Sequence, residues 1–299
     1  MKKSCMKIGC LVYHNILRDT LPATYWYYST SFRQTHSTHY HQDLQMTQQV
    51  FIKTGALLFA AIFIVSCMHT THIGQPFMTV SHPGKYQLVY HTPSQEFPLH
   101  SMATVDGREF LAIDDVILPS VQSLYLLTHW KILDGETVLD LGTGSGVQAV
   151  FAADNASVVV ATDINPAAVK MAQLNAKRNG VNNIIDVRQG DLFSPINKDE
   201  KFDVILFNID YPHSEATQGL WKLHERFFAE VNHYLNRGGR IYYQSGLIDN
   251  AARINSMTNK NGMSILSMRM DVALEADRQP IVYLIKRTLD VEVKAKSSY

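Results

Sequence analysis

From about residue 130 onward, short apolar runs alternate with segments of helical periodicity. The apolar runs predict strands at 137–141, 157–162, 184–188, 204–208 and 240–244. Helices are predicted at 147–153 and 166–179, and two further strands around 263–268 and 281–286. Continuous apolar strands that alternate with helices are typical of a parallel sheet covered on both faces. The pattern therefore predicts an α/β fold with a doubly wound, mostly parallel sheet over residues 130–290.

Residues 68–129 are predicted to form a linker and a small N-terminal cap. Apolar runs indicate strands at 86–90 and 109–113. Pro119 then precedes a helical pattern whose apolar positions are Val121, Leu124, Leu126 and Leu127. At the other end of the chain, residues 291–299 are expected to be a tail.

Residues 1–45 show no sustained period of 2 or 3.6. We expect them to be disordered, or to be an upstream extension of a shorter natural chain that starts at Met46.

Residues 46–67 resemble a signal segment. The apolar run at 55–65 is shorter than the roughly 20 residues that a membrane-spanning helix needs. It fits the apolar core of a secretory signal, and the residues that end at Cys67 resemble a bacterial lipobox with Cys67 as the lipidated residue. A plain membrane anchor over residues 54–67 and a buried helix are the alternatives.

Composition narrows the classes of partner. Hydrophobic residues make up 46% of the chain, enough for a sizeable core. Lys and Arg together number 27, as do Asp and Glu, so the chain has no overall attraction to nucleic acid or acidic membranes. Cys5, Cys10 and Cys67 have no metal-ligand spacing, and the histidine cluster at 36–41 lacks Cys or carboxylate partners. We therefore expect no metal site.

The strongest chemical signal is the segment Val138–Gly146, a strand followed by a glycine-rich turn and a helix. Its glycines permit positive φ and let a ligand approach the backbone closely. The helix start offers free N–H groups at the carboxyl end of the strand, where ligands bind in open α/β sheets. Asp140 stands just before the turn. A carboxylate there would hinder pyrophosphate binding but suits a cationic methionine group.

Asp163 ends the second predicted strand, 21 residues after Gly142. A carboxylate at this spacing can bind both hydroxyls of a ribose. Asn165 and Pro166 read as the N-cap and first residue of the next helix, and Gly180 as its end. A surface turn carboxylate is the alternative interpretation of Asp163.

Asp191 follows the third predicted strand and is expected at the same rim of the sheet. It can accept a hydrogen bond from the exocyclic amine of an adenine, while Leu192 or Phe193 covers the ring. A helix or turn cap is the alternative role of Asp191.

These residues, in this order, resemble the class I S-adenosylmethionine-dependent methyltransferases, which have a Rossmann-like fold. The resemblance runs from about Trp130 to Lys286 and implies S-adenosyl-L-methionine as the methyl donor. It implies that the methionine part is surrounded by Asp140, Gly142, Thr143, Gly144 and Gly146. Asp163 would then bind the ribose, with Asp191 and Leu192 at the adenine.

The end of the fourth strand, Asn208-Ile209-Asp210-Tyr211, resembles the Asn-Pro-Pro-Tyr motif of methyltransferases that act on planar nitrogens. Among these are the small-domain enzymes that modify ribosomal RNA guanine and release-factor glutamine. The resemblance implies that Asn208 contacts the cofactor and accepts a hydrogen bond from the target NH2, and that Tyr211 stacks on the target. Ile209 and Asp210 replace two prolines, which removes a stiffening element. The alternative is that Asn208 contacts only the cofactor and Tyr211 only packs.

The resemblance implies N-methylation of a planar amide or amino group on a protein, an RNA or a small molecule. A catalytically inactive methyltransferase-fold binding module is one alternative, which the altered Ile209-Asp210 pair favours. A nicotinamide-dependent oxidoreductase is another, and it fits less well because Asp140 precedes the glycine turn. The sequence identifies neither the methyl acceptor nor the oligomeric state.

Location remains a choice between two expectations. Six Lys and Arg residues precede the apolar run, whereas the first one after it is Lys85, and this local asymmetry favours export of the domain. S-adenosylmethionine, however, is expected inside cells. The chain is therefore predicted to be either membrane-associated through residues 54–67, with Cys67 lipidated, or cytoplasmic with the catalytic domain facing the cytosol.

Overall fold

A computed structural model describes residues 76–81, 86–246, 248–270 and 280–291. They belong to one compact unit within Met68–Tyr299. The predictions for residues 1–67, including the signal-like run and Cys67, lie outside the described residues, as does the tail at 292–299. In the ranges given above, no helix has both the length and the apolar character needed to cross a bilayer.

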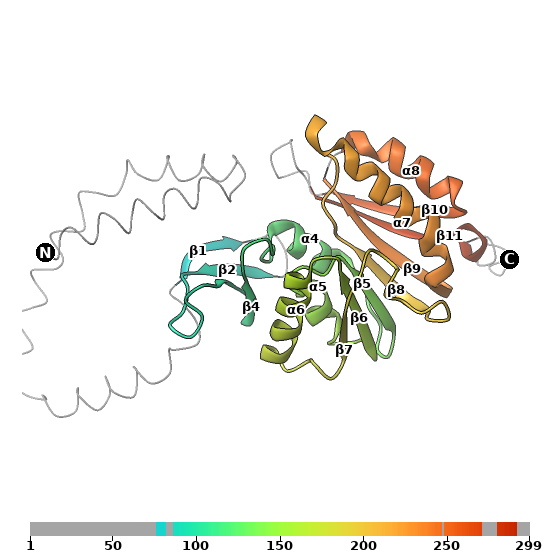
Figure 1. Ribbon diagram of the computed structural model, residues 1–299. Coiled ribbons are helices and arrows are strands. Elements are labelled where there is room, and N and C mark those ends of the chain that lie inside the picture. Colours follow the sequence, from blue (N-terminus) through green and yellow to red (C-terminus); the bar gives the residue numbers. More distant parts are fainter. Residues whose placement is uncertain (1–75, 82–85, 247, 271–279, 292–299) are drawn as a thin grey trace, which may run out of the picture. The chain divides into compact units, whose positions relative to one another are not determined.

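A seven-stranded sheet forms the centre of this unit, in the order β10-β11-β9-β8-β5-β6-β7 (Figure 1). The five strands from β9 to β7 run parallel, β11 is antiparallel to β9, and β10 is antiparallel to β11. The mostly parallel sheet is confirmed. Its strands are β5 (Thr137–Leu141), β6 (Val158–Asp163), β7 (Ile185–Gln189), β8 (Phe202–Phe207), β9 (Leu235–Ser245), β10 (Met263–Met270) and β11 (Ile281–Arg287).

Helices cover both faces of this sheet, and each face has its own apolar core. On β5, Val138 packs in the core with α4 and α5, whereas Leu139 packs in the core with α7 and α8. Successive side chains of a strand point to opposite faces, so a strand covered on both faces is apolar throughout. The helices are α4 (Val121–His129), α5 (Val147–Ala152), α6 (Pro166–Arg178), α7 (Trp221–Tyr234) and α8 (Ala251–Lys260), with short 3-10 turns η1 (Glu215–Leu220) and η2 (Ile248–Asn250).

The predicted boundaries of α6 are confirmed to within one residue. The Asn165 side chain accepts a hydrogen bond from the N–H of Ala167, and Pro166 is the first helical residue. Gly180, with φ of +70°, follows the C-cap. The Asn165 N-cap places the start of α6 three residues after Asp163.

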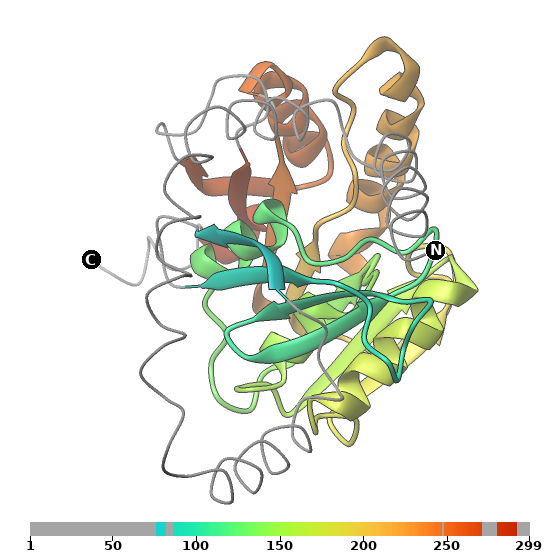
Figure 2. The ribbon, with the colours of Figure 1, turned by 90° about the vertical axis from the view of Figure 1, so that its left-hand side faces the viewer.

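A four-stranded antiparallel sheet, β1-β2-β3-β4, precedes α4 (Figure 2). The predicted cap strands correspond to two of its members, while two others were missed because their runs are short and mix polar with small residues. Leu88, Val105 and Phe110 of this sheet share a core with Val150 and Phe151 of α5. Its strands are β1 (Pro76–Ser81), β2 (Gln87–His91), β3 (Ser101–Val105) and β4 (Arg108–Ala112).

Asn175 of α6 and Asn179 at its C-cap fasten β4 to this helix. Asn175 accepts from the Leu111 N–H at 2.9 Å and donates to the Leu111 carbonyl at 2.8 Å. Asn179, one turn later, makes the same pair with the backbone of Glu109, at 3.2 and 2.8 Å. Each amide side chain replaces a neighbouring peptide group at the edge of β4. Asn175 also donates to the Ser145 carbonyl at 2.8 Å, so it ties β4 to the glycine loop as well.

Helices α7 and α8 were not among the elements predicted from the sequence. The buried positions of α7 are Trp221, His224, Phe227, Phe228, Val231 and Tyr234. Their spacing of three and four residues is that of an amphipathic helix, so the signal was present. The strand predicted at 240–244 is longer, because β9 starts at Leu235 and has an irregular register against β8.

Replacing Asn175 tests this docking. Asn175 is fully buried, and Asn175→Ala leaves three buried backbone groups without a partner. We expect the free energy of unfolding in urea to fall by about 3 kcal/mol. Lys170→Ala, at an exposed position of the same helix, should change it by less than about 0.5 kcal/mol. A loss below about 1 kcal/mol for Asn175→Ala would show that the hydrogen bonds do not hold β4 in place.

Candidate active site

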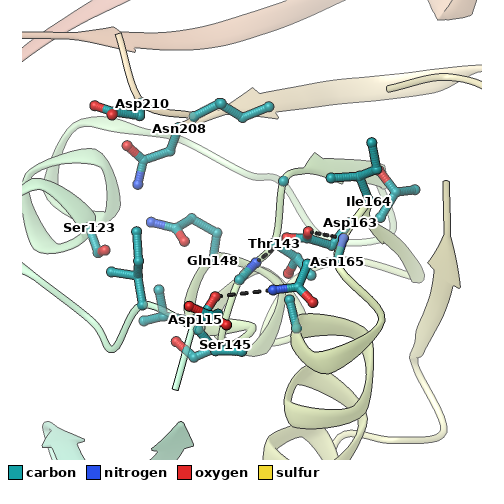
Figure 3. Close-up of a pocket in the computed structure, with 18 of the residues that line it drawn as sticks. Asp115, Ser123, Thr143, Ser145, Gln148, Asp163, Ile164, Asn165, Asn208 and Asp210 are labelled. Atoms are coloured by element: carbon teal, nitrogen blue, oxygen red, sulfur yellow. Dashed lines mark hydrogen bonds between the residues drawn. The ribbon is translucent and has the colours of Figure 1, made fainter. Parts of the chain in front are cut away.

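A cavity of about 590 Å³ lies at the carboxyl ends of the parallel strands (Figure 3). Ligand sites in open α/β sheets occur at this edge, and the volume is within the range of small-molecule pockets. The first turns of α4 and α5 and the exposed side of α7 complete the wall. The segments that line it are 115–118, 142–145, 162–165, 190–192 and 208–210.

The glycine loop forms one wall of the cavity, and its shape depends on two glycines. Gly142 has φ of +71°, and a Cβ there would lie 2.5 Å from Cγ1 of Ile209. Gly146, with φ of +87°, is the N-cap of α5, and a Cβ there would lie 3.2 Å from the Cα of Ala172. Side chains at either position would push the loop away from its neighbours, so the close approach requires glycine.

Asp163 faces the glycine loop. Its Oδ2 accepts from the N–H of Gly144 at 2.9 Å, and its Oδ1 accepts from the N–H of Asn165 at 2.9 Å. The N–H groups of Gly142 and Thr143 both donate to the carbonyl of Thr162, at 2.8 and 2.9 Å. The loop is therefore held against the end of β6. The glycine loop and the Asp163 carboxylate lie next to each other, as the sequence predicted.

Asp140 lies beneath the loop rather than in the cavity lining. It is 1% exposed, and its Oδ2 accepts from the Thr143 hydroxyl at 2.6 Å. Burial raises the pKa of Asp140 to about 7, and the nearby Asp163 adds to the rise, while the Thr143 hydrogen bond opposes it. The structure thus gives Asp140 a contact that supports the loop through Thr143, which itself lines the cavity. Its predicted place beside a methionine group stays a prediction.

Asp191 and Leu192 line the cavity at the end of β7, as expected. Asp191 pairs with Arg226 of α7 at 2.9 Å, and both side chains are partly exposed. Leu192 is 6% exposed and has φ of +48°, an uncommon conformation for a residue with a side chain. Arg226 also lines the cavity. Arg226 was not a predicted site residue because α7 was not predicted.

Asn208 lies in the cavity lining, but Tyr211 does not. Tyr211 is 4% exposed, and its hydroxyl accepts from Nε2 of Gln122 at 3.2 Å. The ring is therefore packed behind the wall. Ile209 and Asp210 line the cavity instead. The arrangement agrees with the alternative in which Tyr211 only packs, and its stacking on a target stays a prediction without support from this geometry.

A buried histidine holds the loop after β8. Nε2 of His224 lies 3.0 Å from the carbonyl oxygen of Asp210, and Nδ1 lies 2.6 Å from the hydroxyl of Tyr243. A carbonyl only accepts, so Nε2 carries the proton and Nδ1 accepts from Tyr243. Burial lowers the pKa of His224 and keeps the ring neutral. This anchor holds a loop that lacks the two prolines of the motif it resembles.

Two buried polar residues in the lining were missed by the sequence analysis. Gln148 is 4% exposed and its Nε2 has no hydrogen-bond partner, and the same is true of the hydroxyl of Thr162, which is 1% exposed. A glutamine in the otherwise apolar α5, directly after the glycine turn, was a readable signal. Over the described ranges, no group of three or more His, Cys, Asp or Glu side chains is arranged to hold a metal ion.

Comparisons with known proteins identify relatives that are methyltransferases by name. A family model described as "Ribosomal protein L11 methyltransferase (PrmA)" matches residues 120–271. A chain of Methanocaldococcus jannaschii that is provisionally named a protein N5-glutamine methyltransferase is 33% identical over 187 residues, which are 57% of this chain and 93% of that one. The release factor glutamine methyltransferase of Bacillus subtilis is 37% identical over 144 residues, 44% of this chain and 49% of that enzyme. A ribosomal protein L11 methyltransferase of Alkaliphilus oremlandii is 33% identical over 132 residues, 44% of this chain and 38% of that enzyme.

Solved structures share the fold. Trm5b of Pyrococcus abyssi aligns with a TM-score of 0.51 and 21% identity, over 71% of this chain and 62% of that one. Trm5 of Methanocaldococcus jannaschii in complex with adenosine aligns with a TM-score of 0.50 and 18% identity, over 63% of this chain and 56% of that one. The chain spans nearly all of the first archaeal relative but less than half of the two bacterial enzymes.

The raised pKa of Asp140 predicts a pH dependence of stability. Between the unfolded pKa of 3.8 and the folded value of about 7, the folded state binds more protons, so this group lowers the free energy of unfolding as pH rises. Asp140→Asn keeps an acceptor for Thr143 and removes the charge. Relative to wild type, its stability should therefore improve by at least about 1 kcal/mol between pH 5 and pH 8. Asp199→Asn, at an exposed site, should show no such trend. A constant difference for Asp140→Asn would refute the shift.

Proposed function

The chain belongs to the PrmA family of S-adenosylmethionine-dependent methyltransferases, and we propose that it transfers the methyl group to the side-chain amide nitrogen of a protein glutamine. Family membership rules out the nicotinamide-dependent oxidoreductase that was considered from the sequence. The proposal rests chiefly on Asn208, whose side-chain amide lines the cavity at the end of β8.

The residues of the cavity fit S-adenosylmethionine. A Cβ on Gly142 would lie 2.5 Å from Cγ1 of Ile209, whereas a Cβ on Gly144 would meet nothing nearer than the Ile117 carbonyl at 3.8 Å. The loop is therefore open at Gly144, where the bare backbone lets a ligand approach closely. Each oxygen of Asp163 accepts one backbone N–H and retains a second lone pair for a ribose hydroxyl. The buried hydroxyl of Thr162 needs a polar partner that a ligand can provide. We assign the ribose to Asp163, the adenine to Asp191 and Leu192, and the methionine part to the loop from Gly142 to Gly146.

Asn208 would orient the acceptor nitrogen. When bound, S-adenosylmethionine supplies an electrophilic methyl group whose leaving group is a neutral thioether, so no acid is needed to expel it. The Asn208 oxygen can accept one N–H of the acceptor amide and so direct the nitrogen toward the methyl group. The acceptor nitrogen gains the carbon and then loses one proton to solvent. Positioning would provide most of the rate increase.

The charges around the cavity favour a protein over a nucleic acid as the acceptor. Four carboxylates line it, those of Asp115, Asp163, Asp191 and Asp210, and Arg226 is the one Lys or Arg among the described lining residues. Arg226 is paired with Asp191. Nucleic-acid binding depends on Lys and Arg contacts to phosphates, and a carboxylate-rich wall repels them. The names of the archaeal relative and the Bacillus enzyme point to glutamine as the acceptor side chain.

We place this activity where S-adenosylmethionine is expected, in the cytosol. The first of the following experiments tests the cofactor site. The second measures turnover, for which the inactive-module alternative makes the opposite prediction, so it separates the two functions.

Asp163→Ala should weaken binding of S-adenosylmethionine. The variant loses the ribose acceptor and the hydrogen bond that fastens Gly144. Calorimetric titration should show a dissociation constant at least about tenfold higher, equal to about 1.4 kcal/mol. Asp199→Ala removes an exposed carboxylate outside the cavity and should bind like wild type. Equal affinity of Asp163→Ala and wild type would remove Asp163 from the cofactor site.

Asn208→Ala should bind S-adenosylmethionine within about twofold of wild type but transfer the labelled methyl group to a glutamine peptide about 100-fold more slowly. The reason is that the variant retains the glycine loop and Asp163 but loses the acceptor for the target N–H. Asn197→Ala, at an exposed position before β8, should leave the rate unchanged. Unaltered turnover of Asn208→Ala would contradict its role, and a wild-type protein that binds the cofactor without any turnover would favour the inactive module.

A further inference from the structure

Gln148 is a polar side chain in an apolar setting. It lies in the first turn of α5, whose other residues are Val147, Ala149, Val150, Phe151 and Ala152, all buried. Gln148 itself is 4% exposed, and it lines the cavity. The proposed assignment of the cofactor to the loop, Asp163 and Asp191 does not use it.

The Nε2 group of Gln148 is buried and has no hydrogen-bond partner. Leaving a buried donor unsatisfied destabilises the fold, whereas an apolar residue of similar size would avoid this cost. A donor of this kind in a cavity wall indicates that a bound molecule provides the acceptor.

The amides of Gln148 and Asn208 point toward one another across the cavity (Figure 3). They come from different elements, α5 and the end of β8. Neither amide hydrogen-bonds the other, so both can serve a molecule that enters between them. One amide side chain can donate while the other accepts.

We propose that Gln148 is a specificity-determining residue that donates a hydrogen bond to the carbonyl oxygen of the acceptor amide, while Asn208 accepts from its N–H. This inference rests on the proposed function. A primary carboxamide has one carbonyl acceptor and two N–H donors, so it satisfies both protein amides at once. A lysine ammonium has donors alone, and it would leave the Gln148 N–H facing another donor. The pair therefore selects a carboxamide over an amine, in the way that a site built to bond a polar group rejects an analogue without it.

The test uses the full chain saturated with S-adenosylhomocysteine, so that binding is measured without turnover. The probes are acetyl-Gly-Gln-Gly methylamide and its lysine counterpart, titrated by calorimetry. Gln148→Met keeps the length of the side chain but has no donor. We expect it to bind the glutamine peptide at least about tenfold more weakly than wild type. Its binding of S-adenosylhomocysteine and of the lysine peptide should stay within about twofold of wild type.

Gln173→Met is the matched control, because Gln173 is an exposed glutamine of α6 outside the cavity lining. It should behave like wild type in every titration. In turnover assays, Gln148→Met should raise KM for the glutamine peptide more than it lowers kcat, which a general folding defect would not do.

Three results would overturn the inference or its premise, and they can be told apart. Unchanged binding of the glutamine peptide by Gln148→Met would remove its role. A loss confined to S-adenosylhomocysteine affinity would assign Gln148 to the cofactor carboxylate instead. A wild-type protein that neither binds nor methylates the glutamine peptide would overturn the proposed function itself, whatever the variant does.

Discussion

The carboxylate of Asp163 joins the glycine loop to the end of β6, and the cavity depends on this junction. One oxygen accepts from Gly144 in the loop, and the other accepts from Asn165 at the start of α6. Hydrogen bonds to an ionised acceptor are stronger than neutral ones, and here they fix two turns relative to one another. The same side chain thereby sets the shape of the cavity and presents its remaining lone pairs to a ligand.

The opposite wall of the cavity, the loop after β8, is held by a hydrogen bond from a buried histidine. The loop from Asn208 to Tyr211 lacks the prolines of the motif that it resembles, yet the His224 ring, donating to the Asp210 carbonyl, fixes its backbone. Tyr243 donates to the other nitrogen and so determines which one carries the proton. Proline would restrict this loop through its own ring, whereas here His224 and Tyr243 of the core restrict it through hydrogen bonds. This makes the loss of Pro-Pro a weaker argument for an inactive protein than the sequence suggested.

The four-stranded sheet contributes to the site by positioning residues 115–118, which follow β4. Asn175 and Asn179 hold β4 against α6, and the segment after β4 continues along the cavity as residues 115–118. The side chain of Asn165 donates to the Asp115 carbonyl at 3.1 Å and so joins this segment to α6. Ile117 and Ile164, which are 76% and 65% exposed, lie in the same lining. Residues 115–118, for which the sequence predicted no helix or strand, thus form part of the cavity wall.

Local sequence patterns were enough to predict the strands of the large sheet and one half of the site. Apolar strands, the Asn165-Pro166 cap and the glycines of the turn are short-range features, since backbone conformation and burial on both faces restrict the residues allowed. The spacing from Gly142 to Asp163 follows from one strand–helix–strand unit, so their neighbourhood was predictable.

Tertiary structure alone decided which polar groups face the cavity. Asp140 and Tyr211 stand in promising positions of the sequence, but one lies beneath the loop and the other behind the wall. Arg226 and His224 belong to no motif, and Gln148 differs from its neighbours only in being polar within an apolar helix. Their roles arise because α5, α7 and the end of β8 converge on one place. The physical reason is that a side chain one position along a strand or helix points elsewhere, and only the packing of distant elements determines which direction is the cavity.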